Sequence, residues 1–147
     1  MKITKTEEHG VRVMMAIARE NRQFTISELA EKEGLTEALI AKLLGMLRRG
    51  GVVKAQRGRK GGYELSRPPE EININMMLAA LGTIYSRGCT ASEDPAKKCP
   101  HLDKCGIQAV WEHLEAHADR IFRQVTLADL VKGRESMQGM LEEITRD

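Results

Sequence analysis

The segment TISELAEKEGLTEALIAKLLGMLRRGG, residues 25–51, predicts two helices joined by a tight turn. Ser27 is expected to cap a short first helix that continues through Lys32, and Thr36 to cap the second, because a hydroxyl oxygen there accepts a hydrogen bond from a free backbone N–H. Gly34 between them permits the left-handed backbone that a tight turn requires. The pattern is that of a helix-turn-helix, and its alternative is an ordinary helical hairpin with a solvated outer face.

The second helix of this pair has an apolar face and an opposite face of small, polar and basic residues. The apolar face, which we expect in the core, consists of Leu35, Leu39, Ile40, Leu43, Met46 and Leu47. On the other face, Ala41 and Gly45 are small enough for the helix to enter the major groove of DNA. The residues in and around this helix that we expect at the DNA are Thr36, Glu37, Ala38, Lys42, Arg48 and Arg49.

A short β-hairpin is expected directly after the helices. The segment VVKAQ (52–56) alternates well enough for a strand, and YELSR (63–67) returns as a second strand. The turn RGRKGG (57–62) places cations on a tip built from glycines, where they can reach phosphates or the minor groove. It lacks the Gly-Lys-Ser/Thr of a nucleotide-binding loop. We therefore predict a DNA-contacting wing whose cations are Arg57, Arg59 and Lys60.

Charge is distributed unevenly between the two halves of the chain. Residues 1–68 hold 14 Lys and Arg against 8 Asp and Glu, a net +6, and residues 69–147 hold 9 against 13, a net −4. A polyanion is therefore expected to meet only the front half. No secretory signal and no apolar run of about 18 residues is evident, so we expect a cytoplasmic protein with no membrane partner. The absence of a plausible nucleophile–base pair predicts a protein that is not an enzyme and has no small-molecule substrate.

Further helices are expected around this unit. Residues 6–20 and 72–81 carry apolar side chains at helical spacing, and Thr126 is expected to cap a short closing helix. After Cys105, apolar residues recur every three or four positions, which favours a dimer interface over packing within one chain. The members of this apolar stripe are Ile107, Val110, Trp111, Leu114, Ala118, Ile121, Phe122 and Val125.

The expected fold is mainly α with a small β wing. Residues 1–82 would form a winged helix-turn-helix DNA-binding domain, and residues 83–105 a cysteine-bearing loop. Residues 106–133 would supply a long dimerisation helix and the short closing helix, and residues 134–147 a polar tail of weak helical character.

All three cysteines, Cys89, Cys99 and Cys105, lie within 17 residues. The segment is rich in Pro, Asp and Lys, so the reactivity of sulfur rather than core packing explains the thiols. A disulfide would leave one thiol over. Three soft ligands suit an iron–sulfur cluster or a zinc ion, and each requires a fourth ligand. His101 is the obvious nitrogen for zinc, and three unrelated thiols are the remaining alternative.

Over nearly its full length the chain resembles the Rrf-type winged-helix regulators typified by IscR, NsrR and RirA. The resemblance rests on the opening MKIT, the helix-turn-helix with Gly34, the wing RGRKGGYEL, the three cysteines and the segment CGIQAVWEHLEAHADRIFRQVTLADLV. It implies a homodimer that binds a partly palindromic operator in double-stranded DNA through helix 36–49 and the wing, with Arg57 on the minor groove. It also implies an iron–sulfur cluster on the three cysteines that tunes this binding.

The chain departs from these relatives at the fourth ligand. IscR-like proteins carry a histidine three residues after the last cysteine, where this chain has Gln108. NsrR-like proteins use a carboxylate from the partner's first helix, and the matching residue is Glu8, with His9 beside it. Ala41 also replaces the glutamate of IscR, so operator specificity is not carried over. The predicted cluster ligands are Cys89, Cys99, Cys105 and Glu8, with His9 and His101 as alternatives to Glu8.

These observations predict a dimeric transcriptional regulator, acting as a repressor, that senses nitric oxide, iron or redox state. Three cysteines and an oxygen ligand favour a [4Fe–4S] cluster, with a [2Fe–2S] cluster as the alternative. Two other functions stay open: a zinc-stabilised DNA-binding protein without sensing, and an iron–sulfur carrier whose helix-turn-helix is only structural.

Overall fold

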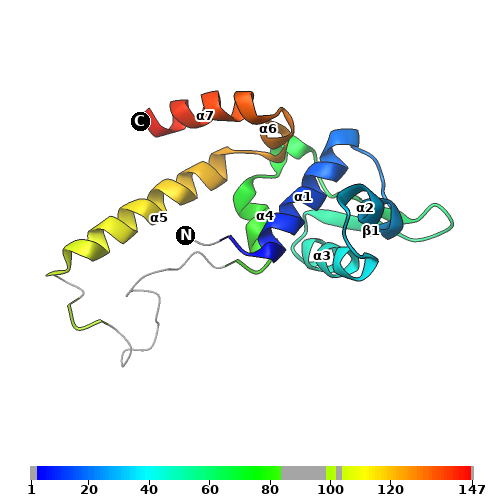
Figure 1. Ribbon diagram of the computed structural model, residues 1–147, viewed down its shortest axis with the longest axis horizontal. Helices are drawn as coiled ribbons and strands as arrows, with labels where there is room; N and C mark the ends of the chain where they lie inside the picture. The colour runs from blue at the N-terminus through cyan, green and yellow to red at the C-terminus, as the bar shows by residue number, and fades with distance from the viewer. Residues whose placement is uncertain (1–2, 84–98, 102–103, 147) are drawn as a thin grey trace.

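The computed structural model describes residues 3–83, 99–101 and 104–146 of the chain. Three helices and a two-stranded antiparallel sheet make up the front half, with the sheet extending to one side of the helices (Figure 1). These elements are α1 (Lys5–Glu20), α2 (Ile26–Glu33), α3 (Glu37–Arg49), β1 (Val53–Gln56) and β2 (Gly62–Leu65). The rear half is helical, and its elements are η1 (Pro69–Glu71), α4 (Ile74–Ala80), α5 (Gly106–Gln124), α6 (Leu127–Val131) and α7 (Arg134–Arg146). The expectation of a mainly α fold with a small β wing is confirmed.

Threonine side chains cap four of the described helices, and at three of them the cap is a reciprocal capping box. Thr4 caps α1, Thr25 caps α2 and Thr126 caps α6, each in a reciprocal capping box with an acidic residue three positions later. The predicted cap at Ser27 is therefore wrong: Thr25 Oγ1 accepts from the Glu28 N–H at 3.1 Å, and Glu28 Oε2 accepts from the Thr25 N–H at 2.8 Å. The reciprocal pair satisfies two backbone donors, whereas a serine at 27 lies inside the helix it was expected to start.

Three other boundaries differ from the sequence-based expectations. The helix predicted over 72–81 begins at Ile74 under an Asn73 cap, because the Pro68-Pro69 pair leads first into the 3₁₀ turn η1. Both wing strands are shorter than predicted and pair from Val53 with Leu65 to Gln56 with Gly62. The segment expected as a polar tail of weak helical character contains a 13-residue helix, α7.

The core lies where α1, α2, α3 and α4 meet. Ile40, Leu43 and Leu47 on α3 are buried as predicted, whereas Leu35, Leu39 and Met46 are half-buried. Leu44 is also fully buried, which the predicted apolar face did not include. Contacts with α1, α2 and α4 on different sides bury a wider arc of α3 than a single apolar stripe would need.

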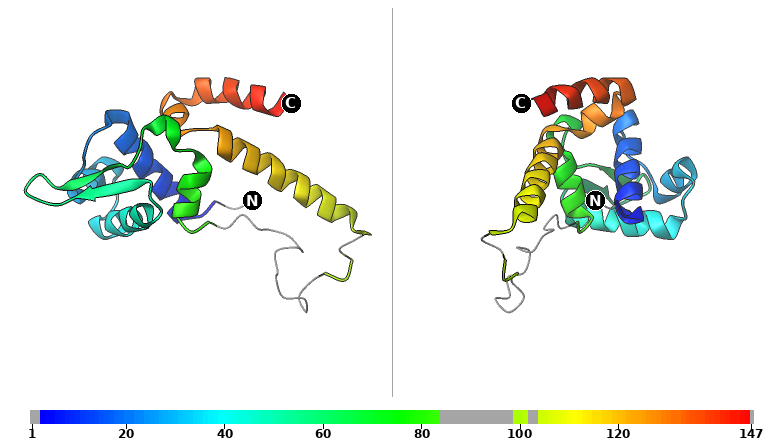
Figure 2. Two further views of the ribbon diagram at one scale, coloured as in Figure 1. Left: turned by 180° about the vertical axis from the view of Figure 1, so that it is seen from behind. Right: turned by 60° about the vertical axis from the view of Figure 1, so that its left-hand side comes forward.

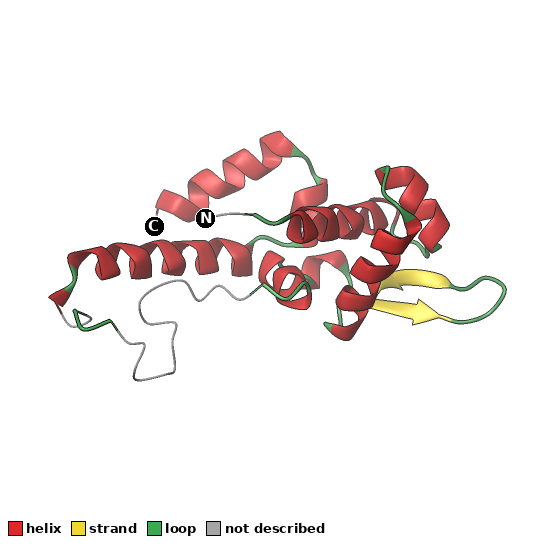
Figure 3. Cartoon of the chain, turned by 60° about the horizontal axis from the view of Figure 1, so that its bottom comes forward, coloured by secondary structure: helices red, strands yellow, loops and turns green. Residues whose placement is uncertain are grey.

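The rear helices are attached to this core by backbone hydrogen bonds beside the start of α4. The Ile74 N–H donates to the Val125 carbonyl at 3.1 Å, and the Leu127 N–H donates to the Ile72 carbonyl at 2.7 Å. From this junction α5 extends away from the front half, so its first turn lies at the far end of the molecule (Figures 1 and 3). No residue of α5 is buried.

Candidate DNA interface and cysteine site

The orientation of α3 is determined by the turn that precedes it. Gly34 has φ 64° and ψ 34°, a left-handed conformation that costs little for glycine, and it ends α2. The Leu35 N–H then donates to the Ala30 carbonyl at 3.0 Å, and Thr36 Oγ1 accepts from the Leu39 N–H at 3.2 Å. The predicted roles of Gly34 and Thr36 in the helix-turn-helix are confirmed.

An ion pair that the sequence did not reveal holds this turn on α1. Arg12 Nε donates to Glu33 Oε2 at 3.1 Å, and its Nη2 donates to the Glu33 carbonyl at 2.9 Å. Glu33 is the last residue of α2, and its side chain is only 10% exposed. The two residues are 21 positions apart, so no local pattern indicates the contact. Arg12 thereby fixes the position of the turn that leads into α3.

The outer face of α3 is open to solvent. The predicted DNA-contacting residues on this element, Thr36, Glu37, Ala38, Lys42, Arg48 and Arg49, are all exposed, and so is Ala41. A Cβ atom built at Gly45 would meet only the guanidinium of Arg49, at 3.5 Å, so packing within the chain does not require a glycine there. The face thus combines small residues along its centre with cations toward its C-terminal end, as a helix in a major groove requires.

The wing is built from close backbone contacts. Gly58 has φ 120°, and its carbonyl accepts from the Gly61 N–H at 2.9 Å. Phe24, in the linker between α1 and α2, exchanges two backbone hydrogen bonds with Tyr63 at 2.9 and 2.7 Å. A Cβ atom on Gly62 would lie 2.6 Å from the Phe24 carbonyl oxygen, so only glycine fits there. Phe24, absent from the predicted site, therefore anchors the wing to the helix-turn-helix.

The cation on the stem of the wing is ion-paired, whereas the cations at the wing tip are not paired within the described residues. On the stem, Lys54 pairs with Glu64 across the strands at 3.2 Å. None of the six predicted DNA-contacting cations pairs with a carboxylate within the described part of the chain, and all six are exposed: Lys42, Arg48, Arg49, Arg57, Arg59 and Lys60. Unpaired cations on one side of a domain can neutralise phosphates without first breaking an internal ion pair.

The predicted cysteine site is only partly covered by the structure. Cys89 lies outside the described residues, while Cys99 and Cys105 are free thiols of intermediate exposure. Cys105 is the residue before α5, and its side chain makes no capping hydrogen bond. Among the described residues there is no group of three or more His, Cys, Asp or Glu that would hold a metal. Two free thiols beside one helix start fit a soft metal or an iron–sulfur cluster as part of its ligand set.

Glu8 lies away from these thiols in the same chain. It is exposed in the first turn of α1, and Lys5 approaches its carboxylate at 3.0 Å. The hydrogen bond from Lys5, and next its charge, lower the pKa of Glu8. The start of α1 and the start of α5 are separated in every view of the molecule (Figures 1–3). The structure therefore does not bring Glu8 together with the Cys105 of its own chain.

Gln108, at the position of the histidine in IscR-like proteins, is held by its own helix. Its amide nitrogen donates to Glu112 Oε1 at 2.7 Å. Its Oε1 is buried and has no hydrogen-bond partner within the described ranges. His101, in the cysteine segment, is exposed, and its carbonyl accepts from the Lys104 N–H at 3.1 Å.

The winged helix-turn-helix, followed by a long helix that starts at a cysteine, agrees with a known family. Residues 3–133 match the model of the Rrf2 family, described as an iron-dependent transcriptional regulator. The chain belongs to the Rrf2 family. This membership confirms a DNA-binding transcriptional regulator that is not an enzyme. In the described residues, no helix is long and apolar enough to cross a membrane.

Individual relatives and solved structures are similar to almost the whole chain. Protein aau3 of Rhizobium meliloti is 30% identical over 142 residues, covering 96% of this chain and 92% of the relative. The HTH-type transcriptional regulator IscR of Pectobacterium carotovorum is 25% identical, covering 92% of this chain and 82% of the relative. Among solved structures, CymR, the global cysteine regulator of B. subtilis, has a TM-score of 0.72 at 25% identity, covering 90% of this chain and 97% of CymR. IscR of T. potens has a TM-score of 0.67 at 25% identity, covering 90% and 87%.

Proposed function

We propose that this Rrf2-family regulator is a cytoplasmic homodimeric repressor whose affinity for DNA is set by an iron–sulfur cluster. The ligands are Cys89, Cys99 and Cys105 of one chain and the partner subunit's Glu8. The observation that carries the proposal is the free thiol of Cys105 directly before α5, because the start of α5 and the start of α1, which bears Glu8, lie apart in one chain (Figures 1 and 2). The family is described as an iron-dependent transcriptional regulator, and iron suits thiolate ligands.

Dimerisation is supported by the first half of α5. Four large apolar side chains there remain exposed, namely Ile107 at 49%, Val110 at 49%, Trp111 at 45% and Leu114 at 53%. Their i, i+3, i+4 and i+7 spacing places them on one face of the helix. A continuous apolar face of this kind marks an interaction surface. A second copy of α5 buries this face and brings the cysteines of one chain toward α1 of the other.

Helix α1 couples the proposed cluster site to the DNA interface. Cys99 and Cys105 precede the start of α5, and Glu8 belongs to the same helix as Arg12, which holds the turn before α3. An iron–sulfur cluster supplies a group that nitric oxide, oxygen or iron shortage alters. With such a cluster bound or lost, α1 and α5 would favour different dimer geometries, which differ in the spacing of their two α3 helices. A [4Fe–4S] cluster fits three thiolates and one carboxylate, with [2Fe–2S] as the alternative.

Anaerobic purification tests the cofactor directly. We expect a brown protein whose absorption and Mössbauer spectra show an iron–sulfur cluster and change on addition of nitric oxide, together with a change in affinity for genomic DNA fragments. A colourless protein that contains one zinc ion per chain would contradict the proposal and establish zinc-stabilised DNA binding. An iron–sulfur protein whose DNA affinity is the same with and without the cluster would contradict the sensing role.

The fourth ligand is tested by comparing three single variants after anaerobic reconstitution. Glu8→Ala is expected to lose its cluster faster to oxygen or chelator, because a carboxylate ligand is replaced by a methyl group. His9→Ala and His101→Ala serve as matched controls and should retain wild-type loss rates. An unchanged rate in Glu8→Ala, with a faster rate in either histidine variant, would assign the fourth ligand to that histidine.

A further inference from the structure

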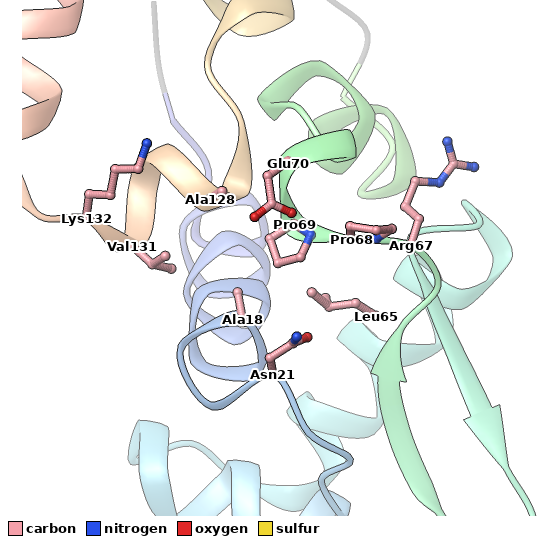
Figure 4. A pocket seen from close by; sticks show the side chains of 10 residues that line it. All are labelled: Ala18, Asn21, Leu65, Arg67, Pro68, Pro69, Glu70, Ala128, Val131 and Lys132. Atoms are coloured by element: carbon pink, nitrogen blue, oxygen red, sulfur yellow. The ribbon is translucent and has the colours of Figure 1, made fainter.

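A cavity of about 530 Å³ opens at the base of the wing, where three parts of the chain meet (Figure 4). It lies between the C-terminal end of α1, the turn that leaves β2, and α6. It contains none of the residues assigned above to DNA or to the cysteine site. Its lining surface is about half polar and half apolar, and the apolar residues that line it are Ala18, Leu65, Pro68, Pro69, Ala128 and Val131.

Two polar side chains turn toward this cavity and two turn away from it. The carboxylate of Glu70 and the carboxamide of Asn21 point inward, whereas Arg67 and Lys132 extend outward (Figure 4). Lys132 Nζ already binds Asp129 Oδ1 at 2.9 Å. Glu70 takes part in no ion pair within residues 3–83, 99–101 and 104–146. An exposed carboxylate that is not ion-paired among the described residues therefore borders this cleft.

The backbone beside Asn21 places partial negative charge at the edge of the cavity. Asn21 is the C-cap of α1, with φ 44° and ψ 49°. The last carbonyl groups of a helix carry partial negative charge and favour cations near the helix C-terminus. The interior of the cavity is thus suited to a positive group, and its walls are suited to an alkyl chain.

We propose that this cavity is an effector site for a small aliphatic ammonium compound. The ammonium group binds the Glu70 carboxylate beside the end of α1, and the alkyl chain lies against Leu65, Ala128 and Val131. Leu65 is the last residue of β2, and Ala128 belongs to α6, which follows α5. A ligand here therefore contacts both the base of the DNA-contacting wing and the junction with α5, independently of the cysteines.

The probe is n-pentylammonium, titrated into the full-length ¹⁵N-labelled protein and followed by NMR. We expect saturable shifts at the backbone amides of the lining residues, whereas pentanoate and 1-pentanol at equal concentration leave these amides unshifted. Glu70→Gln should weaken binding about tenfold, because a charge-assisted hydrogen bond is lost. Glu71→Gln is the matched control, since Glu71 neighbours Glu70 without lining the cavity, and it should bind as wild type. The proposed site would be overturned if 1-pentanol bound as tightly as n-pentylammonium, or if Glu70→Gln and Glu71→Gln weakened binding to the same extent.

A second variant tests the cavity without changing its charge. Ala128→Leu fills the space beside Glu70 and should abolish the amide shifts caused by n-pentylammonium. If the circular dichroism spectrum of Ala128→Leu shows loss of helix, Val131→Phe is used as the cavity-filling variant instead. Retained binding in the folded variant would overturn the assignment. At constant ionic strength, n-pentylammonium at its wild-type dissociation constant should change the affinity of wild type for its selected DNA and should change that of Glu70→Gln much less, because the variant is then mostly unoccupied. Equal affinities with and without the amine would overturn the effector role.

Discussion

Replacing Gly45 with alanine is expected to stabilise the fold and weaken DNA binding at the same time. Gly45 lies in the middle of α3, where alanine is favoured over glycine by about 0.8–1 kcal/mol. The added methyl group meets only the guanidinium of Arg49, at an ordinary contact distance of 3.5 Å, so no strain offsets this gain. For a chain of this size the melting temperature should rise by roughly 2–4 °C.

The same methyl group projects from the face that we place in the major groove. Displacing α3 from the groove removes at least one good base contact, which contributes about 1–3 kcal/mol, so affinity should fall at least about fivefold. The assay pairs thermal unfolding with fluorescence anisotropy on a DNA fragment selected from genomic DNA.

Gly139→Ala is the matched control for this prediction. Gly139 lies inside α7, and a Cβ atom there would meet nothing within 4 Å. It should raise the melting temperature to a similar extent and leave DNA affinity unchanged. A Gly45→Ala protein that melts higher but binds DNA as tightly as wild type would refute the placement of this face in the groove. A lower melting temperature would refute the packing argument.

Three further predictions concern the wing, the thiols and the dimer. Arg59→Ala should weaken binding to all sequences, and the slope of log affinity against log salt should become about 0.9 less steep. Arg57→Ala should in addition relax discrimination at A·T-rich flanks. If both variants bind DNA as tightly as wild type at moderate salt, the wing does not contact DNA. Cys99→Ala and Cys105→Ala should abolish iron binding and leave a folded protein by circular dichroism, and near-normal iron content in either would contradict the cluster. Trp111→Glu should dissociate the dimer in sedimentation velocity without lowering helix content, with exposed Glu112→Ala as the control that stays dimeric.

The predictable parts of the fold are those determined by neighbouring residues. Gly34, Thr36 and Gly58 act within a few positions, so local spacing alone indicated the helix-turn-helix and the hairpin. The wrong cap at Ser27 arose because two hydroxyl residues, Thr25 and Ser27, lie two positions apart, and the reciprocal hydrogen bond from Glu28 makes Thr25 the cap. A search for the capping-box spacing would have found it.

Contacts between distant parts of the chain were not predictable in the same way. Arg12 with Glu33 and Phe24 with Tyr63 join segments whose separation depends on how the helices pack. Glu7 shows the same limit: it is 5% exposed, and its Oε1 accepts from the Thr83 hydroxyl at 2.5 Å, 76 positions away. In sequence it is one of two adjacent glutamates in a first turn, and only the packing of α1 beside the end of α4 distinguishes the buried one from the exposed one.

That distinction makes the proposed cluster and the proposed dimer interdependent. Glu7 is committed to the interior of its own chain, so Glu8 is the carboxylate of this pair that remains available to another subunit. If Glu8 serves the partner's cysteines, its contribution exists only while the α5 faces are joined. In a Trp111→Glu background, Glu8→Ala should then cause no further increase in the rate of cluster loss, whereas in the dimeric wild type it should. Additive effects of the two substitutions would show that Glu8 acts within one chain or not at all, since independent sites contribute independently.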